Sequence, residues 1–206
     1  ATQLVRGIAH SASGSDGGES LWMIIDASPF DKLVKANTTT GALKTDFGDD
    51  VDSDGAKDGV VDAPSANTTG IAFLNNFIYI VGNEQQQSGG INPTLWKINP
   101  QTGAVVSTIN LNGQGINIQD NIGGMTDNGS NLLVYSQNFD FIVEINPETS
   151  QKVGGEKYPQ TQVFGANAFA YHGGRDVFVA ANNNTLVTLA SNLSFESQLS
   201  SDTLRV

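Results

Sequence analysis

The stretch Gly70–Leu111, GIAFLNNFIYIVGNEQQQSGGINPTLWKINPQTGAVVSTINL, contains the pattern that the rest of the chain repeats. Short apolar or alternating segments are separated by Asn, Gly and Pro clusters, which is a strand-and-turn signal and not a helical one. The segment FIYIV is apolar nearly throughout, as in a strand covered on both faces. Four consecutive antiparallel strands form one sheet. The predicted strands are Gly70–Phe73, Phe77–Val81, Thr94–Asn99 and Val105–Leu111.

The same pattern recurs before and after this stretch, so the chain is expected to consist of repeats. Before it, LWMII at Leu21–Ile25 matches FIYIV, and KLVKAN followed by TGAL matches TLWKIN followed by TGAV. The repeats predict one domain, residues 1–206, built from four similar sheets. Their expected bounds are about 4–48, 68–111, 121–155 and 165–200, with an acidic insertion at 46–69 between the first two.

The motifs LWKINPQTG at Leu95–Gly103 and VFVAAN at Val177–Asn182 resemble the β-propeller repeat families, especially the YVTN and NHL-like blades. This resemblance implies an all-β fold, a β-propeller of four four-stranded antiparallel blades. The four blades form either a closed ring or an arc of a larger propeller, and an irregular β-sandwich is the alternative outside this family. Propellers host many unrelated activities, so the likeness predicts a fold and no particular function.

In a propeller, the loops that join second to third strands and one blade to the next emerge on one face. The long loops predicted on this face are 26–31, 82–93, 46–69, 112–122 and 156–166. Binding residues concentrate on loops held by a rigid scaffold, so this long-loop face is where a protein or glycan ligand is expected.

The composition excludes several classes of partner. Of 206 residues, 21 are Asp or Glu and 10 are Lys or Arg, a net charge of −11, which repels nucleic acid and anionic lipid. No window approaches the roughly 18 apolar residues of a membrane-spanning helix, so membrane insertion is not expected. The chain has no cysteine, which excludes disulfides and thiolate metal sites. Acidic, repetitive β chains rich in Asn, Gly and Thr favour an extracellular or cell-surface location.

One segment has the spacing of a metal-binding loop. Residues 50–58 read D-x-D-x-D-G-x-x-D, in which alternate carboxylates converge on a hard cation and the glycine permits a sharp turn. The segment resembles the calcium loops of integrin α-chain propellers and the first part of an EF-hand loop, although Val61 stands where an EF-hand has its bidentate Glu. A solvated acidic loop without metal is the alternative. The predicted Ca²⁺ ligands, in a structural role, are Asp50, Asp52, Asp54, the Ala56 carbonyl and Asp58.

No catalytic motif accompanies this loop. The sequence has no nucleophile elbow, zinc-protease helix motif or phosphate loop, and its two histidines, His10 and His172, are too few for the usual metal triad. Trp22 and Trp96 fall at strand positions where aromatic residues pack between sheets. The sequence therefore favours a non-enzymatic extracellular binding or interaction module with no catalytic residues. The alternatives are a self-associating structural subunit of a surface filament or adhesin, and a propeller-type lyase or hydrolase acting at a central channel.

Overall fold

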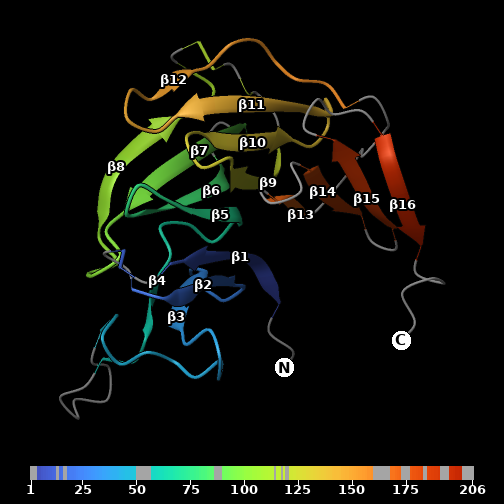
Figure 1. Cartoon of the computed structure of the whole chain (residues 1–206). Coiled ribbons are helices and arrows are strands. Elements are labelled where there is room, and N and C mark those ends of the chain that lie inside the picture. The colour runs from blue at the N-terminus through green and yellow to red at the C-terminus, as the bar shows by residue number, and fades with distance from the viewer. Residues whose placement is uncertain are drawn as a thin grey trace. The chain divides into compact units, whose positions relative to one another are not determined.

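The regular structure in the described part of the chain consists of β-strands. The computed structural model describes residues 4–12, 14–15, 18–49, 57–85, 90–113, 115–116, 118, 121–159, 168–172, 177–182, 185–190 and 195–200. These residues form four antiparallel sheets of four strands each (Figure 1). No helix in the described ranges is long and apolar enough to cross a membrane. The prediction of an all-β fold made of four-stranded antiparallel sheets is confirmed, whereas closure into a ring stays a prediction.

In each sheet the strands lie side by side in chain order. The first sheet contains β1 (Val5–Ser11), β2 (Ser20–Ile25), β3 (Lys32–Ala36) and β4 (Val60–Asp62). The second contains β5 (Thr68–Leu74), β6 (Phe77–Gln85), β7 (Ile91–Ile98) and β8 (Val105–Asn110). The third contains β9 (Ile122–Asp127), β10 (Leu132–Ser136), β11 (Phe141–Asn146) and β12 (Gln151–Lys152). The fourth contains β13 (Ala168–His172), β14 (Val177–Asn182), β15 (Thr185–Ala190) and β16 (Phe195–Ser200).

The chain divides into two compact units, Ala1–Glu84 with Thr94–Ile109, and Gln85–Pro93 with Asn110–Val206. Each unit has its own hydrophobic core. In the first, Trp22 and Ile24 of β2 pack with Ile78 and Ile80 of β6, and Trp96 joins them from β7. In the second, Leu133 and Tyr135 of β10 pack with residues of β11, β13 and β15. The prediction that both tryptophans are core residues is confirmed, since Trp22 is 0% and Trp96 5% exposed.

Local sequence explains the turns between strands. Asn75 and Asn76 connect β5 to β6 and have φ angles of 50° and 61°, the left-handed conformations that asparagine tolerates and that a two-residue hairpin turn requires. The turn between β7 and β8 is organised by Asn99, whose side-chain oxygen accepts hydrogen bonds from the backbone N–H groups two and three residues later, at 2.8 and 3.2 Å. Asn37 and Asn146 make the same bonds in the first and third sheets. The predicted repeat therefore has a common physical basis in an asparagine-capped turn.

The glycine that ends one of these turns supports a testable prediction. Gly103 has a φ of +72°, and a Cβ atom there would lie 2.8 and 2.9 Å from the two methyl groups of Val61. Gly41 has the same place in the first sheet and a φ of +69°, but no atom lies within 4 Å of its Cβ position. Gly41→Ala is expected to lower the free energy of unfolding by about 1 kcal/mol, because alanine is disfavoured at a positive φ and meets no clash there. Gly103→Ala should cost about 1–3 kcal/mol more because of the clash, as measured by urea unfolding. Equal losses for the two variants would contradict this packing.

The outer strand of the first sheet differs from the prediction. The Lys44 N–H donates to the Lys35 carbonyl (3.0 Å), and the Lys35 N–H donates to the Gly59 carbonyl (2.9 Å), so Lys44 and Gly59 lie beside the same residue of β3. The chain therefore leaves the edge of β3 after Lys44 and is beside it again at Gly59, and β4 then continues the pairing with β3. The expected boundary near residue 48 is corrected, because the acidic insertion lies within the first sheet and not between two sheets. An edge position permits this, since an excursion there interrupts no further strand.

Candidate functional site

The ends of the acidic insertion are held together by backbone hydrogen bonds. The Asp58 N–H donates to the Asp49 carbonyl (2.9 Å), and the Gly59 N–H donates to the Phe47 carbonyl (2.8 Å). Gly59 has a φ of +74°, and a Cβ atom there would lie 3.0 Å from the Lys44 carbonyl oxygen, so the close approach of the two ends requires glycine.

Most of the predicted calcium ligands fall outside the residues that the structure describes. These are Asp50, Asp52, Asp54 and Ala56. Asp58, the last predicted ligand, is described and half-buried at the base of the loop. Within the described ranges no three His, Asp or Glu side chains come together as a metal ion would require.

A buried lysine lies beneath the insertion. The Lys35 ammonium group contacts a carboxylate oxygen of Asp46 at 2.9 Å and lies 5.3 Å from the centre of the Trp22 ring. Burial alone would raise the pKa of Asp46, but the Lys35 hydrogen bond and the charges of Lys35 and Lys44 outweigh it and hold that pKa below its usual value. One acidic group of the insertion is therefore already neutralised by the sheet beneath it.

A second polar cluster, which the sequence did not reveal, fixes the loop between β2 and β3. The fully buried carboxylate of Asp31 accepts hydrogen bonds from the backbone N–H (3.0 Å) and the hydroxyl (2.5 Å) of Thr68. The Arg6 guanidinium contacts Asp26 at 2.9 Å and Asp31 at 3.7 Å. These contacts tie the predicted binding loop 26–31 to the start of β1 and to β5. Both carboxylates of this loop are thus paired within the protein.

The third sheet has a comparable cluster around Glu144 of β11. Its carboxylate accepts hydrogen bonds from the side chains of Asn128 (3.1 Å), Asn131 (2.8 Å) and Lys157. Burial would raise the pKa of Glu144, but these hydrogen bonds and the charge of Lys157 lower it below its usual value. The cluster fastens segment 153–159 to the sheet, since the backbone of Lys157 also pairs with Ile142 in both directions.

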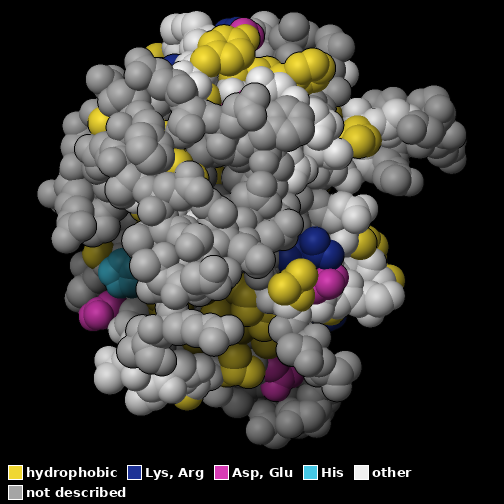
Figure 2. Space-filling model, turned by 90° about the vertical axis from the view of Figure 1, so that its right-hand side faces the viewer, with side chains coloured by type: hydrophobic (Ala, Val, Ile, Leu, Met, Phe, Trp, Pro, Cys, Tyr) yellow, Lys and Arg dark blue, Asp and Glu magenta, His cyan; other side chains and the backbone are white. Residues whose placement is uncertain are grey.

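Segment 153–159 contributes Tyr158 to an exposed aromatic patch. This aromatic patch consists of Phe139, Phe141 and Tyr158. The Phe139 and Phe141 rings lie 6.4 Å apart and nearly parallel, and the Tyr158 ring lies 5.9 Å from Phe141. Phe141 is 7% exposed, whereas Phe139 and Tyr158 are 63% and 59% exposed. Two large apolar rings thus face solvent around a buried third ring. Figure 2 shows hydrophobic side chains gathered beside an acidic and a basic one at the top of the molecule.

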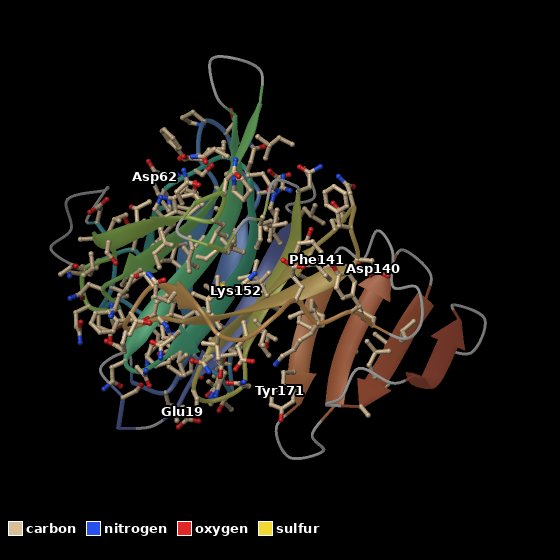
Figure 3. The ribbon with its side chains drawn as sticks, turned by 90° about the horizontal axis from the view of Figure 1, so that it is seen from above. Glu19, Asp62, Asp140, Phe141, Lys152 and Tyr171 are labelled. Carbon is tan, nitrogen blue, oxygen red and sulfur yellow. The ribbon has the colours of Figure 1, made fainter. Side chains whose placement is uncertain are left out.

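Polar contacts hold the aromatic patch in place. The hydroxyl of Tyr135, a core residue, donates to the Asp140 carboxylate at 2.8 Å, and Asp140 has a φ of 53° that turns the chain between the two phenylalanines. Figure 3 shows Asp140 and Phe141 next to each other where β11 begins. The Tyr158 hydroxyl bonds to the Glu156 carboxylate (3.2 Å), which raises the pKa of Tyr158 above its usual value, and Lys152 pairs with Glu156 at 3.3 Å.

The exposed residues of the aromatic patch lie in the two kinds of loop where the sequence predicts binding residues. Phe139 lies in the connection between the second and third strands of its sheet, and Tyr158 lies in the segment that follows the fourth strand. In this sheet the two connections emerge side by side, as predicted for the long-loop face. The residues themselves were missed, although an apolar Phe139 in a turn that usually takes polar residues was a usable signal.

Comparisons with known proteins agree with this architecture. No protein-family model matches the sequence, and no curated protein matches it. Among solved structures, Myxococcus xanthus glutaminyl cyclase matches with a TM-score of 0.64 at 9% identity, covering 99% of this chain and 76% of that one. Hydrazine synthase of Kuenenia stuttgartiensis matches with a TM-score of 0.54 at 12% identity, covering 95% of this chain and 49% of that one. The WD40 repeats of RRP9 match with a TM-score of 0.53 at 11% identity, covering 97% and 51%.

These structures are propeller-like or WD40-type folds, and at such low identity the likeness concerns the fold alone. The chain spans about half the length of two of the three proteins. The propeller-like, repeated fold predicted from the sequence is thereby supported. No particular activity follows from these matches, because the matched proteins include both enzymes and a repeat domain.

Proposed function

We propose that this chain is a non-enzymatic, extracellular binding module of the β-propeller kind, with YVTN or NHL-like blades that close into a ring of four. Its aromatic patch contacts a protein or glycan ligand. The observation that carries the proposal is the exposure of Phe139 and Tyr158 around the buried Phe141. Exposed aromatic clusters are costly in water and mark interaction sites, because partners bury them with a large gain in free energy.

The fixed geometry of the aromatic patch supports the same proposal. Asp140 is held by Tyr135, and Tyr158 is held by Glu156, so the exposed rings lose little conformational entropy on binding. Carboxylates at the rim offer acceptors for hydroxyl or N–H groups of the ligand, which provide specificity at the edge of an apolar contact.

A binding screen with matched variants tests this function. Labelled protein is applied to a glycan array and to a displayed-peptide library, and the affinity of each confirmed ligand is then measured. Phe139→Ala and Tyr158→Ala are each expected to weaken binding at least tenfold, because anchor residues contribute more than about 1.4 kcal/mol. The control is Val153→Ala, on the same segment as Tyr158 and 37% exposed but outside the aromatic patch. Ligands that bind both aromatic variants with unchanged affinity would contradict the proposed surface.

We further propose that the module holds a structural Ca²⁺ ion through Asp50, Asp52, Asp54, the Ala56 carbonyl and Asp58. Support comes from the spacing of these residues and from the closed base of the insertion, where Asp58 is bonded to the residue just before the motif. Carboxylates that converge without a counter-ion repel one another, and a bound divalent cation offsets this repulsion. The ion would order an acidic excursion and take no part in chemistry.

Calcium removal is expected to lower the melting temperature. When its free concentration is 100 times its dissociation constant, an ion that binds only the folded chain adds about 2.7 kcal/mol to the free energy of unfolding. The measurement compares thermal unfolding in Ca²⁺ with unfolding in EGTA, for the native chain and for Asp54→Ala. The variant should lose the Ca²⁺-dependent shift, whereas Asp49→Asn, just outside the motif, should keep it. If the native chain melted at the same temperature in Ca²⁺ and in EGTA, the proposed structural Ca²⁺ ion would be contradicted.

A further inference from the structure

The outer strand of the second sheet is unusually exposed. β8 is the last strand of that sheet, beyond β7 (Figure 1), and five of its six residues are exposed to solvent. Val105 is 47% and Val106 is 53% exposed, and because neighbouring residues of a strand point to opposite faces, both faces present a β-branched side chain. The edge of such a strand is a template for another strand.

Two other outer strands have the features that prevent edge pairing. β4 has three residues, and its Asp62 forms an ion pair with Lys32. β12 has two residues, one of them Lys152, and segment 153–157 then returns to pair with β11. Short length, charge and coverage are the usual protections of a sheet edge. β8, with the sequence VVSTIN, contains no charged residue and no proline over six residues.

Charge favours a second copy of this chain as the strand that pairs with β8. A net charge of −11 makes two copies repel each other, so they associate best where the surface carries no charge, and β8 contains none of the 31 charged residues (21 acidic plus 10 basic). At physiological ionic strength the repulsion between more distant charges is screened within about 8 Å.

The sequence of β8 is also complementary to itself. A two-fold axis perpendicular to the sheet and centred on Ser107 places Ser107 opposite its own copy. It places Val106 opposite Thr108 and Val105 opposite Ile109. β-Branched pairs and hydroxyl pairs are stabilising cross-strand neighbours in antiparallel sheets. From the exposed edge, the missing charge and this pairing, we propose that two copies of the chain associate through antiparallel β8 strands, joining two four-stranded sheets into one of eight strands.

This association differs from the proposed function and from a filament. It uses main-chain hydrogen bonds of β8 and none of the residues of the aromatic patch. An interface with two-fold symmetry uses the same strand on both copies, so assembly ends at a dimer.

Sedimentation equilibrium of the full 206-residue chain, over a wide concentration range at 0.15 M salt, tests the dimer. The native chain is expected to show a concentration-dependent dimer. Val106→Lys should weaken it at least tenfold, since it places two like charges close together across the axis. Leu43→Lys, which adds the same charge at a 50% exposed residue outside β8, is the control and should leave the dimer unchanged. A native monomer at all concentrations, or equal effects of both lysines, would overturn the proposal.

Single cysteines test the register and do not depend on a charged variant. The native chain contains no cysteine, so each introduced thiol is unique. Residues directly opposite have Cβ atoms about 4.5–5.5 Å apart and diagonal neighbours about 7–8 Å, so only position 107 approaches disulfide distance from its own copy. Under mild oxidation, Ser107→Cys should give a covalent dimer several times faster than Val106→Cys, Thr108→Cys or the control Leu43→Cys. Cross-linking no faster at position 107 than at position 43 would overturn β8 pairing, and a maximum at 106 or 108 would overturn this register.

Discussion

Trp22→Ala is expected to lower the free energy of unfolding by about 3–5 kcal/mol, the range for truncating a fully buried aromatic side chain. The Trp22 ring meets Phe47 edge-on at 5.1 Å and stacks on Phe73 at 6.4 Å, so it joins the residue at the base of the acidic insertion to β5, the first strand of the second sheet. Its indole N–H donates to the Ser11 hydroxyl at 3.0 Å. The substitution removes all three contacts and leaves a cavity.

Urea unfolding measures this loss, and two variants calibrate it. Phe30→Ala truncates an aromatic residue that is 45% exposed, and it should change stability by less than about 1 kcal/mol. Trp22→Phe keeps part of the ring volume and should cost less than Trp22→Ala. If Trp22→Ala and Phe30→Ala had similar effects, Trp22 would not be the centre of this core.

Asp31→Ala is expected to cost about 3 kcal/mol or more. Its carboxylate is 0% exposed and is the acceptor for both the backbone N–H and the hydroxyl of Thr68. Leaving each buried donor without an acceptor costs about 1–3 kcal/mol, and Arg6 would lose one of its two carboxylate partners.

Asp26→Ala is the matched control for Asp31→Ala. Asp26 contacts the same arginine at 2.9 Å but its side chain is 43% exposed, so its loss should cost less than about 1 kcal/mol. In a double-mutant cycle, Thr68→Val combined with Asp31→Ala should cost clearly less than the sum of the single changes, because the orphaned hydroxyl is gone. Strict additivity would show that the two side chains do not interact.

The strands and turns were predictable because they depend on local sequence. The predicted strand Val105–Leu111 is β8, Val105–Asn110, and the Asn75-Asn76 hairpin has the positive φ angles that its residues favour. The repeated turn at Asn99 was recognisable because the capping side chain, the turn and the final glycine lie within five residues. Strand ends were less exact: β6 extends to Gln85, four residues beyond the predicted Val81.

The remaining features depend on contacts between residues distant in sequence. Gly59 rejoins the sheet beside Lys35, which lies 24 positions earlier in the chain. The sequence around Gly59 contains no pattern that predicts this pairing. The aromatic patch forms because Tyr158 packs against Phe141, and the buried Asp31 finds its partner in Thr68, 37 positions later in the chain. The calcium motif is the reverse case: its spacing is local, so the sequence suggests it directly, and it stays a prediction.

The chain leaves the first sheet at Lys44 and rejoins it at Gly59 beside the same strand, and the hydrogen bond from the Asp58 N–H to the Asp49 carbonyl joins the two ends of segment 50–57. Doubling the length of such a closed segment costs only about 0.6 kcal/mol in closure entropy. In the second sheet the corresponding strand, β8, has no insertion, so the fold accommodates a fourth strand with or without one. Segment 50–57 is therefore suited to exchange: evolution, or an engineer grafting an epitope, can replace it while Asp46 keeps its contact with Lys35 and Phe47 keeps its contact with Trp22.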